Sequence, residues 1–244
     1  MDSYQLKWPK IILFGDSLTQ HSFEPENGLW GALLADRLQR TCDVIPRGFS
    51  GYNTRMCKIL LPRIFNKENI QGVILFVICL GANDCCGAES PTQQHVPLDE
   101  YVQNLYQMIE YLKSIGLSKH QILLITPPPY HHETYQEYCM SVGSAIPVRS
   151  NEMVAKYAAE CYSLGVSSGL DVVHLYREMS KDQNWSRFLI DGLHFSHTGA
   201  VFVYTQLWPH VARRTEKLKM IGPLWTDFDK EDKEDKRLPS KPAL

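Results

Sequence analysis

The stretch that decides the fold class is Val73-Ile74-Leu75-Phe76-Val77-Ile78-Cys79-Leu80 (VILFVICL). It is apolar at every position and rich in β-branched side chains, whereas a strand with one solvated face alternates apolar and polar residues. Continuous apolarity is typical of a central strand in a parallel sheet that helices cover on both faces. Polar side chains, Asn83 and Asp84, follow directly after the point where this strand is expected to end.

Strands and helices are predicted to alternate on both sides of this run. The other predicted strands are Lys10–Gly15, Asp43–Arg47, Gln121–Thr126 and Leu170–His174. The predicted helices are Gly28–Cys42, a helix capped by Asn53 or Thr54 and running to Phe65, Asp99–Ile115, Ala145–Leu164 with Gly165 as its stop, and Thr198–Arg214. After the prolines at 127–129, residues 130–144 are expected to form a polar loop. The alternation predicts an α/β fold with a five-stranded parallel sheet and right-handed crossovers.

Composition excludes several classes of function. Lys and Arg total 25 against 27 for Asp and Glu, so the net charge of −2 gives no reason to expect a nucleic-acid partner. The longest apolar run, VILFVICL itself, is too short to span a bilayer, so stable membrane insertion is not expected. Met1–Lys7 lacks the apolar run of a signal peptide.

The seven cysteines are an odd number, which without a secretion signal indicates reduced thiols and a cytoplasmic protein. No linker divides the chain, and a core of this size needs no disulfide or metal. A single domain over residues 1–226 is therefore expected, followed by a charged, flexible tail at 227–244. A homo-oligomer is compatible with this sequence.

Two segments that follow predicted strands carry groups suited to acyl transfer. Ligands bind beyond the carboxyl ends of the strands in such sheets. Ser17, in Gly15-Asp16-Ser17-Leu18-Thr19, is expected to be exposed at this edge of the sheet. Its hydroxyl becomes a candidate nucleophile when a base takes its proton. A turn in which Asp16 or Ser17 caps a helix is the alternative. Gly51, after the second strand, can offer its N–H to a ligand, although an ordinary glycine-rich turn has the same sequence pattern.

Two further segments complete the set. Asn83 follows the most buried strand, where its side-chain amide can donate to a developing oxyanion; an Asx turn is the alternative. In Asp191-Gly192-Leu193-His194, a tight turn lets the carboxylate accept from one imidazole nitrogen while the other faces Ser17. His197 is the local competitor, but it lacks a carboxylate at the matching offset.

In this order, the four segments resemble the blocks of the GDSL/SGNH hydrolase family, and specifically its isoamyl acetate-hydrolysing esterase branch. The similar segments are FGDSLTQ, RGFSGYNTR, GANDCC, HVPLDEYVQNL, ILLITPPP, DGLHFSHTG and LWP, spread from about Ile11 to Pro209. The resemblance implies a flavodoxin-like, three-layer α/β/α fold. It also implies catalytic Ser17, Asp191 and His194, with an oxyanion hole made by Ser17 N–H, Gly51 N–H and Asn83 Nδ2.

Three residues depart from the family pattern, and one family residue has no assigned role. Pro46 stands where many members have Asn, beside the Gly51 loop. Cys85 and Cys86 follow Asn83 and Asp84, where small or polar residues are expected, so two thiols are expected to crowd the acyl pocket. Asp16 can cap the helix after Ser17, brace a neighbouring loop or orient His194.

The function expected from these residues is hydrolysis of small-molecule, short-chain esters of the acetate type through an acyl-enzyme. No cofactor or metal is expected, because the sequence holds no phosphate-binding loop, dinucleotide fingerprint or paired CxxC. The polar segment Pro127–Gly143 predicts neither a long apolar groove nor a helix for docking on lipid. The alternatives are a thioesterase, a lysophospholipase or a carbohydrate acetylesterase, and, outside enzymes, an inactive flavodoxin-like binding module.

Overall fold

The computed structural model describes residues 6–222 and 224–227. A five-stranded parallel sheet in the order β2-β1-β3-β4-β5 forms its centre. The strands are β1 (Lys10–Gly15), β2 (Asp43–Gly48), β3 (Val73–Cys79), β4 (Ile122–Ile125) and β5 (Asp171–Val173). These bounds confirm the predicted sheet to within two residues at each end. The prediction of a tail beginning at Asp227 lies, apart from Asp227 itself, outside the described residues.

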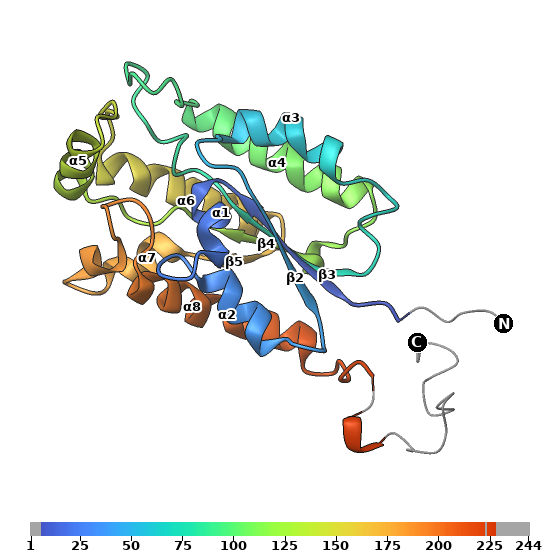
Figure 1. Cartoon of the computed structure of the whole chain (residues 1–244). Coiled ribbons are helices and arrows are strands. Elements are labelled where there is room, and N and C mark those ends of the chain that lie inside the picture. The colour runs from blue at the N-terminus through green and yellow to red at the C-terminus, as the bar shows by residue number, and fades with distance from the viewer. Residues whose placement is uncertain (1–5, 223, 228–244) are drawn as a thin grey trace.

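Helices cover both faces of the sheet, which gives the predicted three layers (Figure 1). On one face, α3 (Thr54–Ile64) packs against α4 (Leu98–Ser114), which packs against α6 (Asn151–Ser167). On the other face, α2 (Trp30–Arg37) packs against α8 (His197–Thr215). Side chains of β3 are nearly all buried between these layers, as its continuous apolarity predicts.

The strand register brings the carboxyl ends of all the strands into one row. Gly15 pairs with both Gly48 and Cys79, Cys79 with Ile125, and Ile125 with Val173. The loops that follow these residues therefore leave the sheet side by side at one edge. The short helix α1 (Ser17–Gln20) lies directly over this edge. It is so close that a Cβ on Gly48 would come within 1.9 Å of the Gln20 backbone nitrogen.

Three predictions for the second half of the chain were wrong. Residues 130–144 are not a loop throughout but contain α5 (His132–Ser141), which buries Cys139 and half-buries Tyr135 one turn earlier. The long helix after it begins at Asn151 rather than Ala145, since Pro147 disfavours helical geometry at the preceding residue and Ser150 supplies the cap.

The same helix, α6, continues past its predicted stop at Gly165 to Ser167. This glycine serves close packing, because a Cβ there would lie 2.3 Å from Val172 Cγ2 on β5. Two short elements after β5 were not predicted. They are α7 (Leu175–Ser180) and a 3-10 turn at Trp185–Phe188.

Candidate active site

Ser17 is the first residue of α1, immediately after β1. Asp16 is the N-cap of this helix, and its Oδ1 accepts a 2.9 Å hydrogen bond from Leu18 N. The capping interaction fixes the turn at the end of the strand and so fixes the direction of the serine side chain. Ser17 Oγ lies 3.0 Å from His194 Nε2, a hydrogen-bonding distance, although 177 residues separate the two in sequence.

His194 is held by Asp191 through both its backbone and its ring. Asp191 Oδ1 accepts from the N–H groups of Leu193 (2.8 Å) and His194 (2.7 Å), which closes the tight turn. Its Oδ2 lies 2.6 Å from His194 Nδ1. Burial alone raises the pKa of Asp191, but the hydrogen bond and charge of His194 outweigh it, so the pKa lies below its ordinary value. An ionised carboxylate at this position favours the tautomer whose Nδ1 carries the proton and whose Nε2 faces the serine.

Gly51 and Asn83 lie on two loops that are tied to each other by hydrogen bonds. Asn83 Nδ2 donates to Tyr52 O at 2.9 Å, and Gln94 Nε2 donates to Gly51 O at 2.8 Å. Gly51 has a φ of +80°, a left-handed conformation that glycine adopts without strain. One proton of the Asn83 amide is used by Tyr52, which leaves the second for another acceptor.

The neighbouring Asp84 anchors the start of α3. Its Oδ1 accepts from both the backbone N–H and the hydroxyl of Thr54. Within the part of the chain that the structure describes, the N–H groups of Ser17 and Gly51 have no hydrogen-bond acceptor. These two donors and the spare Asn83 proton are therefore available to an acceptor on a ligand.

The chain is similar to known proteins over most of its length. A sequence model described as GDSL-like lipase/acylhydrolase matches residues 11–207. The chain belongs to this family. It is 43% identical over 223 residues to the human isoamyl acetate-hydrolyzing esterase 1 homolog, covering 91% of this chain and 89% of that protein. A rice GDSL esterase/lipase is 36% identical over 201 residues, covering 82% and 76% of the two chains.

Solved structures show the same fold at lower sequence identity. A lipase/acylhydrolase from Enterococcus faecalis superposes with a TM-score of 0.65 at 24% identity, covering 88% of this chain and 99% of that one. An acetyl xylan esterase superposes with a TM-score of 0.64 at 18% identity, covering 83% and 99%. As a member of the GDSL family with esterase relatives over most of its length, the protein is a serine-type carboxylic ester hydrolase.

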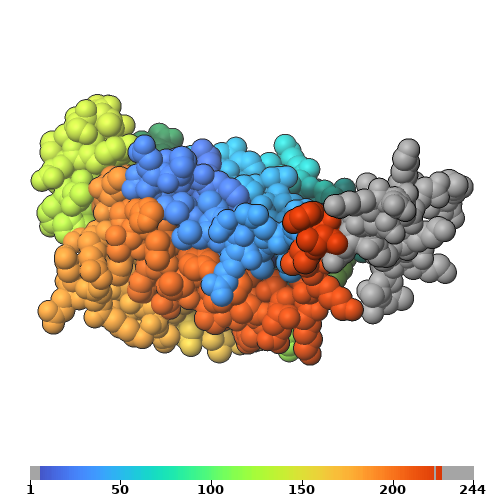
Figure 2. Space-filling view, turned by 60° about the horizontal axis from the view of Figure 1, so that its bottom comes forward, coloured from blue at the N-terminus to red at the C-terminus, as the bar shows by residue number. Residues whose placement is uncertain are grey.

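A cleft of about 300 Å³ opens beside the GDSL serine and histidine. Besides His194 and Asp191, its lining includes Leu18, His21, Glu24, Asn27, Gly28, Tyr138, Ile190 and Phe195. Figure 2 shows α5, in yellow-green, at one end of the molecule beside segments from the first fifth of the chain and from around residue 190. The cleft is therefore walled by the segment after Ser17, by α5 and by the turn that carries Asp191.

His21 and Tyr138 line the cleft but were not predicted from the sequence. The His21 ring packs edge-on against the His194 ring, with centroids 5.6 Å apart. Burial and the neighbouring His194 lower the pKa of His21, so it is neutral at neutral pH. His21 lies four residues after Ser17, about one helical turn, so its spacing in the sequence could have identified it. Tyr138 carried no such signal because its segment was taken for a loop.

Asp16 and Asp84, which adjoin Ser17 and Asn83 in the sequence, are fully buried. Each has an Oδ2 without a hydrogen-bond partner among the described residues. Burial raises the pKa of Asp16 to about 7, partly offset by the Leu18 N–H. Burial likewise raises the pKa of Asp84 to about 6, against the opposing hydrogen bonds from Thr54. Of the three roles expected for Asp16, the hydrogen bond from Leu18 N–H supports the helix cap.

The departures from the family pattern lie away from the cleft. Cys85 and Cys86 are both fully buried, and neither lines the cleft beside His194. Pro46 lies on β2, an edge strand, where a missing N–H is tolerated. His197 is exposed at the start of α8 and makes no contact with Ser17.

Two features are absent from residues 6–222 and 224–227. No group of three or more His, Cys, Asp or Glu side chains there is arranged to hold a metal ion. No helix there is long and apolar enough to cross a membrane.

Proposed function

We propose that the protein hydrolyses short-chain, acetate-type esters of uncharged alcohols, with Ser17 as nucleophile, His194 as general base and Asp191 as the residue that orients the histidine. The observation that carries this proposal is the continuous hydrogen-bonded chain from Ser17 Oγ through both nitrogens of His194 to Asp191. The similarity to isoamyl acetate-hydrolyzing esterase homologues supports the acetate class. An inactive binding module would have no need of this alignment.

The proposed reaction has two steps. His194 Nε2 removes the Ser17 proton as Oγ attacks the ester carbonyl, and the resulting oxyanion accepts from Ser17 N–H, Gly51 N–H and Asn83 Nδ2. His194 then protonates the leaving alcohol, and water, activated by the same histidine, releases the acid from the acyl-enzyme. Asp191 stabilises the imidazolium in both steps. These groups complete the reaction without a metal or an organic cofactor.

The position and size of the cleft support the choice of substrate. The alcohol oxygen has to reach His194 Nε2, so the alcohol occupies the cleft that His194 lines. A volume of about 300 Å³ is at the lower end for ligand sites and suits a small alcohol. Leu18, Ile190 and Phe195 make part of the wall apolar, while the carboxylate of Glu24 accepts from the N–H groups of Glu26 and Asn27.

The test is a series of p-nitrophenyl esters from acetate to palmitate, measured on the wild type and on Ser17→Ala. Where an acyl site accepts a chain, each added buried methylene raises kcat/KM about fourfold, corresponding to about 0.8 kcal/mol. We expect kcat/KM to fall beyond about four to six acyl carbons, where that gain stops. A kcat/KM that rises through octanoate would instead favour the lysophospholipase or thioesterase alternative.

Ser17→Ala should lower activity on every ester by about 10³-fold or more without changing the melting temperature. Retention of a tenth of wild-type activity by the folded variant would refute the nucleophile assignment.

A cytoplasmic location is part of the proposal. All seven cysteines are free and buried, as in proteins that fold under reducing conditions. Imaging of the tagged full-length chain in cells tests this point.

A further inference from the structure

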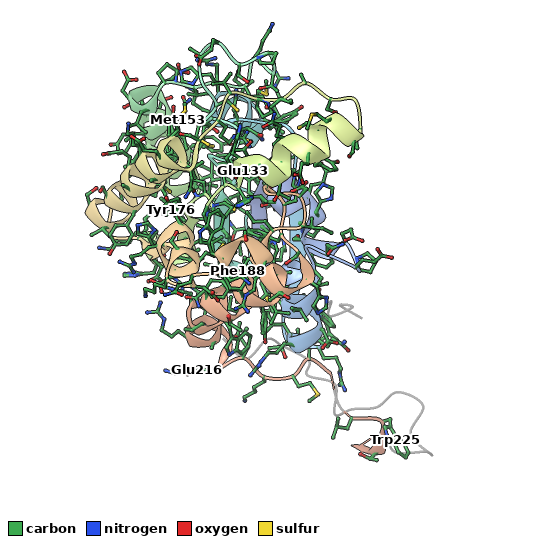
Figure 3. All side chains as sticks on the ribbon, turned by 90° about the vertical axis from the view of Figure 1, so that its left-hand side faces the viewer. Glu133, Met153, Tyr176, Phe188, Glu216 and Trp225 are labelled. Atoms are coloured by element: carbon green, nitrogen blue, oxygen red, sulfur yellow. The ribbon has the colours of Figure 1, made fainter. Side chains whose placement is uncertain are left out.

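A second pocket of about 460 Å³ lies where the N-terminal ends of α5 and α6 meet the Trp185–Phe188 turn. Its lining includes Tyr130, His131, Glu133, Arg149 and Ser150, and it shares no lining residue with the catalytic cleft. Figure 3 labels Glu133 and Met153, which mark the first turns of the two helices. Nothing in the proposed ester hydrolysis uses this pocket.

Arg149 is a buried cation that forms no ion pair with the described residues. Its side chain is 4% exposed, and Nη2 donates only to Cys86 Sγ, at 3.0 Å. Its Nε and Nη1 are buried and have no acceptor among the described residues, where no carboxylate forms an ion pair with it either. Removing a guanidinium from water costs several kcal/mol unless a negative charge compensates it. A water molecule could accept these hydrogen bonds, but it could not neutralise the charge.

Tyr130 presents a third donor at the same place. Its ring lies against the guanidinium, with Arg149 Cζ 5.2 Å from the ring centroid. The hydroxyl is buried and has no partner among the described residues. Burial raises the pKa of Tyr130 to about 12, although the Arg149 charge opposes the shift, so the hydroxyl keeps its proton at neutral pH. Two guanidinium nitrogens and one phenol thus lack acceptors on two side chains that lie against each other.

The backbone around the pocket adds positive potential. His131 is the N-cap of the ten-residue α5, and Ser150 is the N-cap of the 17-residue α6. Both helices therefore direct the positive ends of their dipoles toward the pocket. One group opposes an anion. The carboxylate of Glu133 lies at the rim, largely exposed, with Oε2 3.7 Å from His131 Nε2.

We propose that this pocket binds a small oxyanion, a carboxylate or phosphate group, whose oxygens accept from Arg149 Nε and Nη1 and from the Tyr130 hydroxyl. The negative charge compensates the buried guanidinium, and the two helix ends reinforce it. The two nitrogens and the phenol are themselves buried, so a side chain of the pocket wall has to move for the oxyanion to reach them. The site stands apart from Ser17 and does not depend on the proposed esterase activity.

Isothermal titration calorimetry with sodium phosphate and, separately, sodium acetate tests the site, using the full chain carrying Ser17→Ala in a buffer without oxyanions. Saturable one-site binding of at least one anion is expected, and the tighter of the two identifies the ligand as a phosphate or a carboxylate. Tyr130→Phe should weaken binding about tenfold or more through loss of one charge-assisted hydrogen bond. Tyr138→Phe is the matched control. It lies on α5 but lines the other cleft, and it should leave binding unchanged.

Two charge variants give opposite expectations. Glu133→Gln should tighten binding, because it removes a like charge from the rim. Arg149→Met should abolish binding, and if that variant fails to fold, Tyr130→Phe decides the question. Absence of saturable binding for both anions would overturn the proposal. Equal affinities for Tyr130→Phe and Tyr138→Phe would overturn it as well. Because every variant carries Ser17→Ala, neither result bears on whether Ser17 is the nucleophile.

Discussion

The substitution Gly192→Ala tests whether the turn that carries Asp191 and His194 is held in place by contact with α5. Gly192 has a φ of +91°, and a Cβ there would lie 2.4 Å from His131 O and 2.7 Å from Tyr135 N. Both neighbours are backbone atoms of α5 or its N-cap, so no side chain can rotate to make room. The His131 N–H also donates to Gly192 O at 2.9 Å, which ties the two segments together.

The size of the effect follows from the required displacement. Ordinary van der Waals contact begins at 3.4 Å, so the turn and the start of α5 have to separate by about 1 Å. A left-handed backbone costs an L-residue about 1–2 kcal/mol in addition. Misplacement of a catalytic group by about 1 Å lowers rates about 10²-fold. We therefore expect kcat/KM on p-nitrophenyl acetate to fall about 100-fold, with a loss of about 1–3 kcal/mol in the free energy of unfolding.

Gly143→Ala is the matched control. Gly143 also has a positive φ, +66°, but nothing lies within 4 Å of its Cβ position. It should lose about 1 kcal/mol of stability and keep its activity. Urea unfolding and titration of the active serine with a fluorophosphonate separate unfolded protein from slow protein. Gly192→Ala activity within threefold of Gly143→Ala, about 0.6 kcal/mol, would refute the reasoning.

Three further predictions concern the site. His194→Ala should lower kcat/KM about as much as Ser17→Ala, and His197→Ala should change it little; the opposite ranking in the same ester assay would show that the base is misassigned. Asn83→Ala should lower kcat about 10²–10³-fold with a smaller effect on KM, since it removes one oxyanion donor and also the tether on the Gly51 loop; a pure KM effect would contradict this. Because burial raises the pKa of Asp16 to about 7, that carboxyl stabilises the native state most below about pH 4, and the contribution is lost as the pH rises through about 7. Asp16→Asn should flatten the pH dependence of urea unfolding across that window; an unchanged slope would count against the raised pKa.

The sheet was predictable because its strands are short apolar runs that end in glycine or polar residues. Lys10–Gly15 and Val73–Cys79 satisfy this description almost residue for residue. The grouping of Ser17, Gly51 and Asn83 at one edge follows from parallel strands whose carboxyl ends share a register at Gly15 and Cys79. Such information is local in sequence, since each residue type and its distance from a strand end can be read directly.

What the sequence did not reveal depends on contacts between distant segments. The sequence HETYQEYCMS is short and polar, and a ten-residue helix of this kind is marginal without tertiary packing. Its formation follows from the burial of Cys139 and the contact of its first turn with Gly192, neither of which is visible in the segment itself. The contact of His21 also joins distant segments, because its ring packs against a ring 173 positions away in the chain, although its spacing from Ser17 was visible in the sequence.

Helix α5 is the element that connects the features that the sequence left unassigned. Its N-cap, His131, lines the second pocket, where we propose that a small oxyanion binds. The His131 N–H donates to Gly192 O in the turn that carries His194. Tyr138, near the other end of the helix, lines the cleft beside His194. Because it buries only one side chain fully, it contributes little to the core, and substitutions on it should change stability less than those in β3. Because the helix lies between the two pockets, amino-acid substitutions in it can alter the shape of the cleft without replacing Ser17, Asp191 or His194. Differences in ester preference among relatives with the same four sequence blocks are therefore expected to lie in this helix rather than in those blocks.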